Sequence, residues 1–205
     1  FPSKANSQSE MAMATLQQLK QYMGLSHQGF TIKTPASFQA NLPAHLTQPM
    51  TLNHPSNVLS QPVYIDFHSG HLNNPNEIVS VMAIQLSHWL LQPSELDLLG
   101  GEKMRHQAAE LLSIALGSGV MVANSAFTFR GGGCGSCHNT KLGREAMLSE
   151  AESCYALALF CRDNDIPIKS ALPHLKPHLR GFLKRANKQI SANAALHSNN
   201  KAIAT

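Results

Sequence analysis

The placement of proline decides where this chain can form long helices. Five of its eleven prolines lie between residues 30 and 62, at positions 35, 43, 49, 55 and 62. Proline inside a helix removes a backbone hydrogen bond and clashes with the preceding turn, so we expect this region to be extended and irregular, with short strands. Directly after it, Val63, Ile65 and Phe67 recur at every second position, which is the period of a strand with one buried face.

Helix-start signals lie on both sides of this region. Ser7 and Glu10 form a capping box ahead of a helix that is predicted to end at Gly24. Asn74 is followed by a proline, and these residue types are preferred at the N-cap and at the first position of a helix. We expect that helix to run to about residue 91.

Three further helices are predicted towards the C-terminus. A helix over about 102–123 contains Gly117 and Gly119, which we attribute to close packing on a neighbour because glycine destabilises a helix interior. Ser149 begins another capping box, ahead of an apolar run. A basic amphipathic helix follows over about 179–190.

These signals predict one mainly α-helical domain of the α+β class, and 205 residues are enough to bury its core. The predicted domain covers residues 1–190, with an N-terminal helix over 7–24, irregular chain and short strands over 25–72, a helical part over 74–190, and a flexible tail over 191–205.

Composition narrows the classes of partner. Gln85, Ser87 and His88 interrupt the longest apolar run before it reaches the ~18–20 residues of a spanning helix, so no membrane span is expected. The net charge of +4, from 16 Lys and Arg against 12 Asp and Glu, is small. The C-terminal basic stretch lacks interleaved aromatic residues, so we expect a solvated face there and no nucleic acid as a partner. The four cysteines favour free thiols and a cytoplasmic location.

The predicted helix at 74–91 contains a frame that is informative about chemistry. In zinc metallopeptidases with a His-Glu-x-x-His motif, two histidines four residues apart hold the metal, and the glutamate takes a proton from the bound water. The same frame here has Ile84, Gln85 and His88 at those positions. A hydrocarbon side chain cannot coordinate a metal, and an amide has no useful proton affinity near neutral pH.

The residues around this frame resemble a group of bacterial zincin-like domains over roughly two thirds of the chain. The matching motifs, in chain order, are His54 and Pro55, Pro75 and His88, Ala109 to Leu111 ahead of Gly117 and Gly119, Ala123 to Ser125, Leu148 to Glu150, and Tyr155 to Phe160.

The resemblance implies a zincin-like domain with a degenerate active site. It places His88 at the second metal-ligand position and Glu110 at the position of an acidic residue that would be a third ligand. Other donors near this site are His106, His68 and His71, although none has the usual spacing. The missing carboxylate would cost about 10²- to 10⁴-fold in rate. We therefore expect a non-catalytic binding or scaffolding module with a protein or peptide partner, no required cofactor, and zinc as a possible ligand.

A second motif leaves two alternatives open. Cys134, Cys137 and His138 match the Cys-x-x-Cys-His pattern of covalent c-type haem attachment, which would make the chain a periplasmic redox protein. The same three residues, with Cys154 or Cys161, would instead hold a structural zinc ion.

Overall fold

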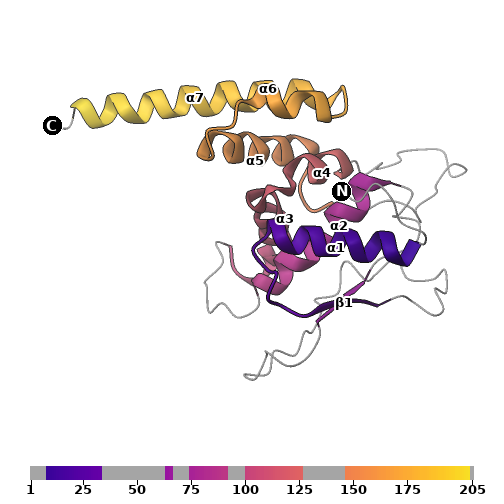
Figure 1. Ribbon diagram of the computed structural model, residues 1–205. Coiled ribbons are helices and arrows are strands. Elements are labelled where there is room, and N and C mark those ends of the chain that lie inside the picture. Colours follow the sequence, from indigo (N-terminus) through magenta and orange to yellow (C-terminus); the bar gives the residue numbers. More distant parts are fainter. Residues whose placement is uncertain (1–7, 34–62, 67–73, 92–99, 127–145, 204–205) are drawn as a thin grey trace, which may run out of the picture.

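The structure is a computed structural model, and it describes residues 8–33, 63–66, 74–91, 100–126 and 146–203. The described part is mainly α-helical, as predicted (Figure 1). In chain order the elements are α1 (Gln8–Tyr22), β1 (Phe30–Lys33), β2 (Val63–Asp66), α2 (Pro75–Leu90), the 3₁₀ turn η4 (Glu102–Met104), α3 (Arg105–Ser113), the π-helical turn η5 (Ile114–Ser118), α4 (Gly119–Ser125), α5 (Glu150–Asp163), α6 (Ile168–Ala171), the 3₁₀ turn η6 (Leu172–His174) and α7 (Leu179–Ile203).

Helix α2 is the centre of the N-terminal half. Its N-cap is formed as the sequence predicts, because the side chain of Asn74 accepts a hydrogen bond of 3.1 Å from the backbone N–H of Asn76. Every residue from Ile78 to Ser87 is buried, so the helix is surrounded by protein on all sides. Helices α1, α3 and α4 pack against it, together with β2, which pairs in parallel with β1.

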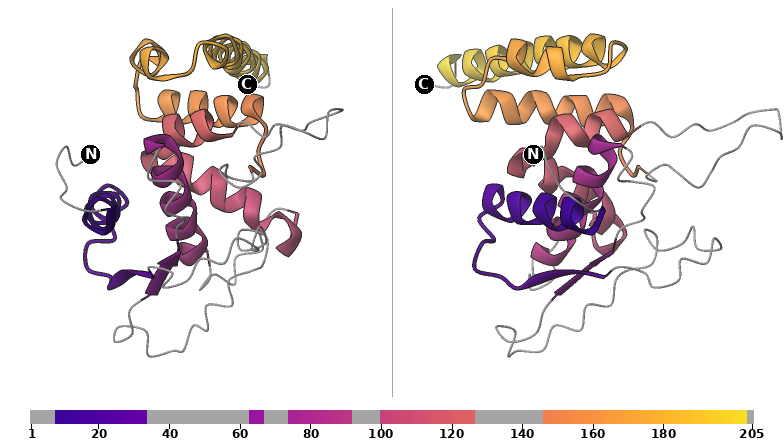
Figure 2. Two further views of the ribbon diagram at one scale, coloured as in Figure 1. Left: turned by 90° about the vertical axis from the view of Figure 1, so that its right-hand side faces the viewer. Right: turned by 45° about the vertical axis from the view of Figure 1, so that its right-hand side comes forward.

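The C-terminal half is a second layer of helices. Helix α5 packs against both α4 and α7, and their apolar side chains form one continuous cluster. The predicted capping box is present at its start, where the backbone N–H of Glu152 donates to the Ser149 hydroxyl at 3.3 Å and the Ser149 N–H donates to the Glu152 carboxylate at 2.7 Å. Helices α1 and α7 lie on opposite sides of the structure (Figures 1 and 2).

A buried amide joins the two halves. Asn124, near the end of α4, is 4% exposed. Its Nδ2 donates to Oδ1 of Asn76 at 3.2 Å and to the carbonyl of His174 at 2.8 Å, and its Oδ1 accepts from the N–H of Lys176 at 2.9 Å. The start of α2 is thereby tied through α4 to the segment that leads into α7.

The two glycines of the predicted helix over 102–123 have different roles. Gly119 packs closely, as expected, since a Cβ atom there would lie 2.8 Å from Cδ1 of Leu157 on α5. For Gly117 the packing explanation is wrong, because a Cβ there would meet nothing within 4 Å. Its φ of 100° is the reason for glycine, since this conformation is strained for residues with a Cβ. The helical stretch is therefore interrupted at η5 and is not one regular helix.

The C-terminal helix is longer than the sequence analysis expects. The prediction ended it at about residue 190 and assigned 191–205 to a flexible tail, whereas α7 continues to Ile203. The physical reason is that residues 191–203 contain no proline or glycine to stop the helix and include several alanines, the residue of highest helix propensity.

One helical stretch in the described part, Glu102–Ser125, is long and apolar enough to cross a membrane by length and composition alone. More than half of its apolar window, 56%, is buried inside the protein. It packs against α2 and α5, which is the environment of a core helix.

The contrast between two glycines gives a test of the backbone argument. Replacing Gly117 with alanine is expected to lower the free energy of unfolding by about 1–2 kcal/mol, because alanine resists a positive φ. Gly181 is an exposed helical residue of α7 with open space around it. Replacing Gly181 with alanine is expected to raise the free energy of unfolding by about 0.5–1 kcal/mol. Urea unfolding of both variants measures these changes, and equal effects of the two substitutions would contradict the assignment.

Candidate functional site

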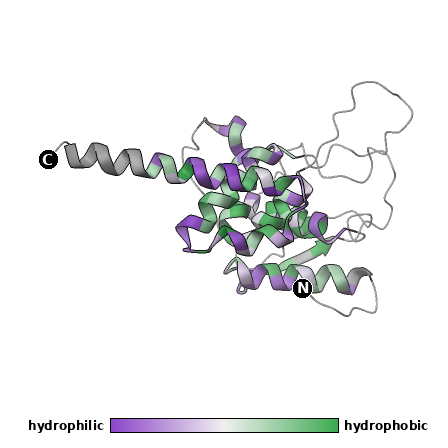
Figure 3. Ribbon diagram, turned by 90° about the horizontal axis from the view of Figure 1, so that it is seen from above, coloured by the Kyte–Doolittle hydropathy of each residue, from purple (hydrophilic) through white to green (hydrophobic). Residues whose placement is uncertain are grey.

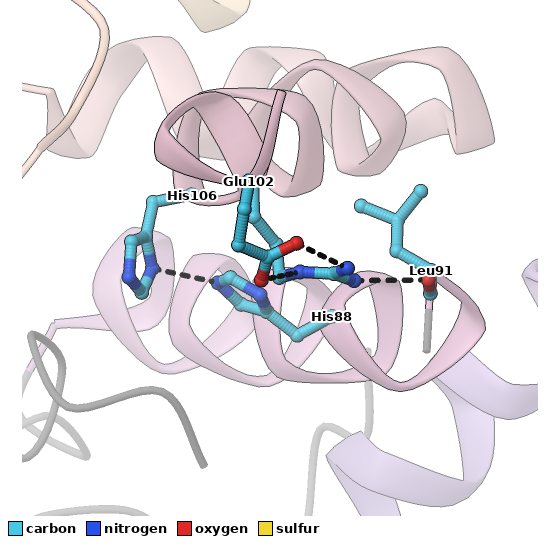
Figure 4. A network of polar contacts seen from close by, with 5 residues as sticks. His88, Leu91, Glu102 and His106 are labelled. Atoms are coloured by element: carbon cyan, nitrogen blue, oxygen red, sulfur yellow. Dashed lines mark hydrogen bonds and ion pairs between the residues drawn. The ribbon is translucent and has the colours of Figure 1, made fainter. Parts of the chain in front are cut away.

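The C-terminal turn of α2 and the N-terminal turn of α3 bring two histidines together (Figure 4). Nε2 of His88 lies 3.3 Å from Nδ1 of His106, and the rings meet edge to face with centroids 5.0 Å apart. One of the two nitrogens is protonated and donates a hydrogen bond to the other. Both side chains are half-buried.

An ion pair beside the histidines fixes how the two helices meet. The guanidinium of Arg105 donates to both carboxylate oxygens of Glu102, at 2.6 Å for Nη2 and with Nε as the second donor. Its Nη1 donates to the carbonyl of Leu91 at 3.0 Å, so the start of α3 is held against the C-terminus of α2. The hydrogen bond between the side chains raises the pKa of Arg105 and lowers the pKa of Glu102.

The environment of His88 keeps it neutral. Burial, with smaller contributions from the neighbouring His106 and Arg105, lowers its pKa from 6.5 to about 4. A neutral imidazole is the form that binds metal ions. Zinc–nitrogen bonds of about 2.0–2.1 Å in a tetrahedral site place two nitrogens about 3.3 Å apart. The separation of the two ring nitrogens therefore fits two ligands of one ion.

The two positions of the frame that depart from His-Glu-x-x-His, Ile84 and Gln85, lie in the interior of α2. Ile84 is 8% exposed and Gln85 is 6% exposed. Ile84 is one helical turn before His88, on the same face, where the motif would have its first ligand. Neither side chain supplies a metal ligand or a general base in this position.

Glu110, to which the resemblance gives a metal-ligand role, is bound to the backbone in this structure. It is 2% exposed, and its two carboxylate oxygens accept hydrogen bonds from the backbone N–H groups of Met147 at 3.0 Å and Leu148 at 2.9 Å. These bonds anchor the segment that leads into α5. Among the described residues, no group of three or more His, Cys, Asp or Glu side chains is arranged to hold a metal ion.

Only some of the other predicted site residues lie in the part of the chain that the structure describes. Cys134, Cys137 and His138 lie outside the described residues, as do His54, His68 and His71, so the haem and structural zinc alternatives stay predictions. Cys154 and Cys161 are buried free thiols on α5. Burial raises the pKa of both, to about 11 for Cys154, which keeps them protonated and poor metal ligands.

His106 is the residue whose role the sequence analysis missed. It was considered only as a donor without the usual spacing, yet it lies closest to His88 in the described part of the site. The two helices predicted over 74–91 and 102–123 contain the signal for this contact. If consecutive helices pack antiparallel, the end of the first lies beside the start of the second, which brings His106 near His88.

Comparison of the chain with protein-family models, with curated proteins and with solved structures finds no match.

The lowered pKa of His88 predicts a pH-dependent stability. The unfolded chain binds this proton near pH 6.5 and the folded chain near pH 4, so unfolding takes up a proton between these values. The contribution of His88 is complete above pH 6.5 and falls as the pH is lowered towards 4. In NMR titrations the His88 ring signals are expected to stay constant from pH 8 to about 5.5, and a midpoint near 6.5 would contradict the burial argument.

The bonds of Glu110 predict a structural penalty. Replacing Glu110 with alanine removes two charge-assisted hydrogen bonds and leaves two buried N–H groups without their acceptor, which is expected to lower the free energy of unfolding by about 3 kcal/mol. Replacing the exposed capping residue Glu152 with alanine should cost only about 1 kcal/mol. Urea unfolding compares them, and a loss at Glu110 no larger than at Glu152 would refute the anchoring role.

Proposed function

We propose that this chain is a non-catalytic, zincin-like binding or scaffolding module. The observation that supports this proposal best is the composition of the α2–α3 site. It holds a pair of imidazoles, while an aliphatic side chain and an amide occupy the positions of the first ligand and of the base.

The absence of a base in the motif argues against hydrolysis. A hydrolytic site must take a proton from water at the moment of attack, and a carboxylate near the operating pH is suited to this step. Gln85 remains an amide at every physiological pH. The acidic side chain that the resemblance assigns to the metal, Glu110, already accepts two backbone hydrogen bonds. Glu102, a further acid beside the site in the described part of the chain, is paired with Arg105.

A metal ion is compatible with the pair but is not needed to hold it. Two imidazole ligands give a weaker zinc site than the three protein ligands of catalytic centres. Without metal, the hydrogen bond between His88 and His106 satisfies the two facing nitrogens. The two helices already pack against each other and are joined by the hydrogen bond from Arg105, so the module folds as a scaffold whether or not zinc is present.

Rebuilding the motif tests the proposal directly. Replacing Ile84 with histidine and Gln85 with glutamate would restore His-Glu-x-x-His on α2, beside the imidazole of His106. If the arrangement is zincin-like, the double variant should bind zinc about 100-fold more tightly than the unaltered chain, measured by isothermal titration calorimetry. The same variant with His88 replaced by alanine is the matched control, and it should lose this gain.

Two outcomes would refute the proposal. One is a folded double variant, verified by circular dichroism, that binds zinc no more tightly than the unaltered chain. The other is peptide hydrolysis by the unaltered chain that disappears on His88→Ala, since an active enzyme needs no restored glutamate.

A further inference from the structure

The C-terminal helix accounts for the whole net positive charge of the protein. Of the sixteen Lys and Arg residues of the chain, five lie in α7, which has no Asp or Glu. The remaining eleven are outnumbered by the twelve acidic residues. The net charge of +4 is therefore not spread thinly over the molecule but is concentrated on one helix.

Four of the five basic residues of α7 occupy the face that points away from the protein. Leu179, Leu183, Ala186 and Ile190 form the buried stripe of the helix. At 100° per residue, the opposite side is occupied by residues that are all exposed, namely Arg180, Lys184, Arg185 and Lys188. We call these four residues the basic face. Seen from above, strongly hydrophilic positions recur along α7, and the helix extends beyond the other elements (Figures 1 and 3).

Two of these cations are held in place by the protein. Arg180 donates from Nε to the carbonyl of Leu175 at 3.1 Å and from Nη2 to that of Pro173 at 3.4 Å. The guanidinium of Arg185 lies over the ring of Phe182, 4.9 Å from its centroid. Among the described residues no carboxylate forms an ion pair with the basic face. The two arginine charges are thus held in place at exposed positions, which reduces the ordering cost of binding an anion.

We propose that the basic face of α7 binds the phosphodiester backbone of nucleic acid without reading its sequence. Arg180 to Lys188 span about 12 Å of helix, a length over which duplex DNA presents about seven phosphate charges. Lysine and arginine contacts to phosphates are the main source of sequence-independent affinity. This proposal replaces the expectation of a merely solvated basic stretch, and it does not depend on the function of the α2–α3 site.

The surface is less suited to other anionic partners. An amphipathic helix that lies on a membrane inserts bulky apolar side chains, but the apolar stripe of α7 is buried against α5. An acidic protein partner would need an apolar or aromatic anchor at the centre of the contact. Between the charges, Gly181 has no side chain, and the ring of Phe182 is half-buried against the apolar cluster and covered by Arg185, so neither offers such an anchor.

Fluorescence anisotropy with a labelled 24-base-pair DNA duplex, the full chain and a salt series tests this inference. We expect binding at 50 mM salt that is independent of sequence, with log K falling against log salt at a slope of about −3.6 for four phosphate contacts. The variant K184Q/K188Q should reduce affinity at least tenfold and the slope to about −2. Both residues are exposed, so the fold should be unaffected. Single-stranded DNA and duplex RNA serve as parallel arms, and weaker but salt-dependent binding to them also supports a backbone contact.

The matched control removes the same charge elsewhere. K103Q/R162Q changes two exposed cations outside the basic face and is expected to alter affinity less than twofold. An equal loss in this control would show that only net charge matters and would overturn the proposal. Absence of binding at 50 mM salt up to 100 µM protein would overturn it too, as would tighter binding to vesicles containing phosphatidylserine than to any of the nucleic acids.

Discussion

The side chain of Asn124 is the interaction on which the arrangement of the two halves depends. It uses both of its N–H donors and its carbonyl oxygen, with partners that come from the start of α2 and from the segment before α7. Beside it, the hydroxyls of Ser125 and Ser80 lie 2.8 Å apart, which adds a second polar contact between α4 and α2. Apolar packing alone is tolerant of sliding, whereas a buried amide that loses its partners is penalised. The register of α4 between the two apolar clusters is thereby fixed.

This fixed register has consequences at the histidine pair. Helix α4 continues from α3 through η5, so the position of α4 constrains the direction from which α3 approaches α2. At the N-terminus of α3, Arg105 donates a hydrogen bond to the carbonyl of Leu91, which follows α2. Towards the C-terminus of α3, Glu110 accepts a hydrogen bond from the backbone ahead of α5. His106 lies between these two contacts in the sequence of α3. The short distance between the imidazoles is therefore imposed by the surrounding packing.

The sequence predicted those features that depend on neighbouring residues. The caps at Asn74 and Ser149 involve partners two or three residues away, and both are present in the structure. The contacts of Asn124 and Glu110 join residues 37 to 52 positions apart, so they cannot be predicted from a local sequence pattern. Glycine at position 117 was assigned to packing because a positive φ and a close approach favour the same residue type. The length of α7 was underestimated because a polar sequence without breakers is compatible with either helix or coil.

The α2–α3 site is electrically balanced without a metal ion. A site made for zinc holds an excess of electron-pair donors, which repel one another or need protons when the metal is absent. Here Ile84 and Gln85 are uncharged, His88 is kept neutral by burial, and the guanidinium of Arg105 is paired with Glu102. The negative charge of Glu110 faces two N–H dipoles. The uncharged side chains of Ile84 and Gln85 avoid the penalty that burial imposes on an unpaired charge, so these two buried positions are compatible with a stable metal-free fold.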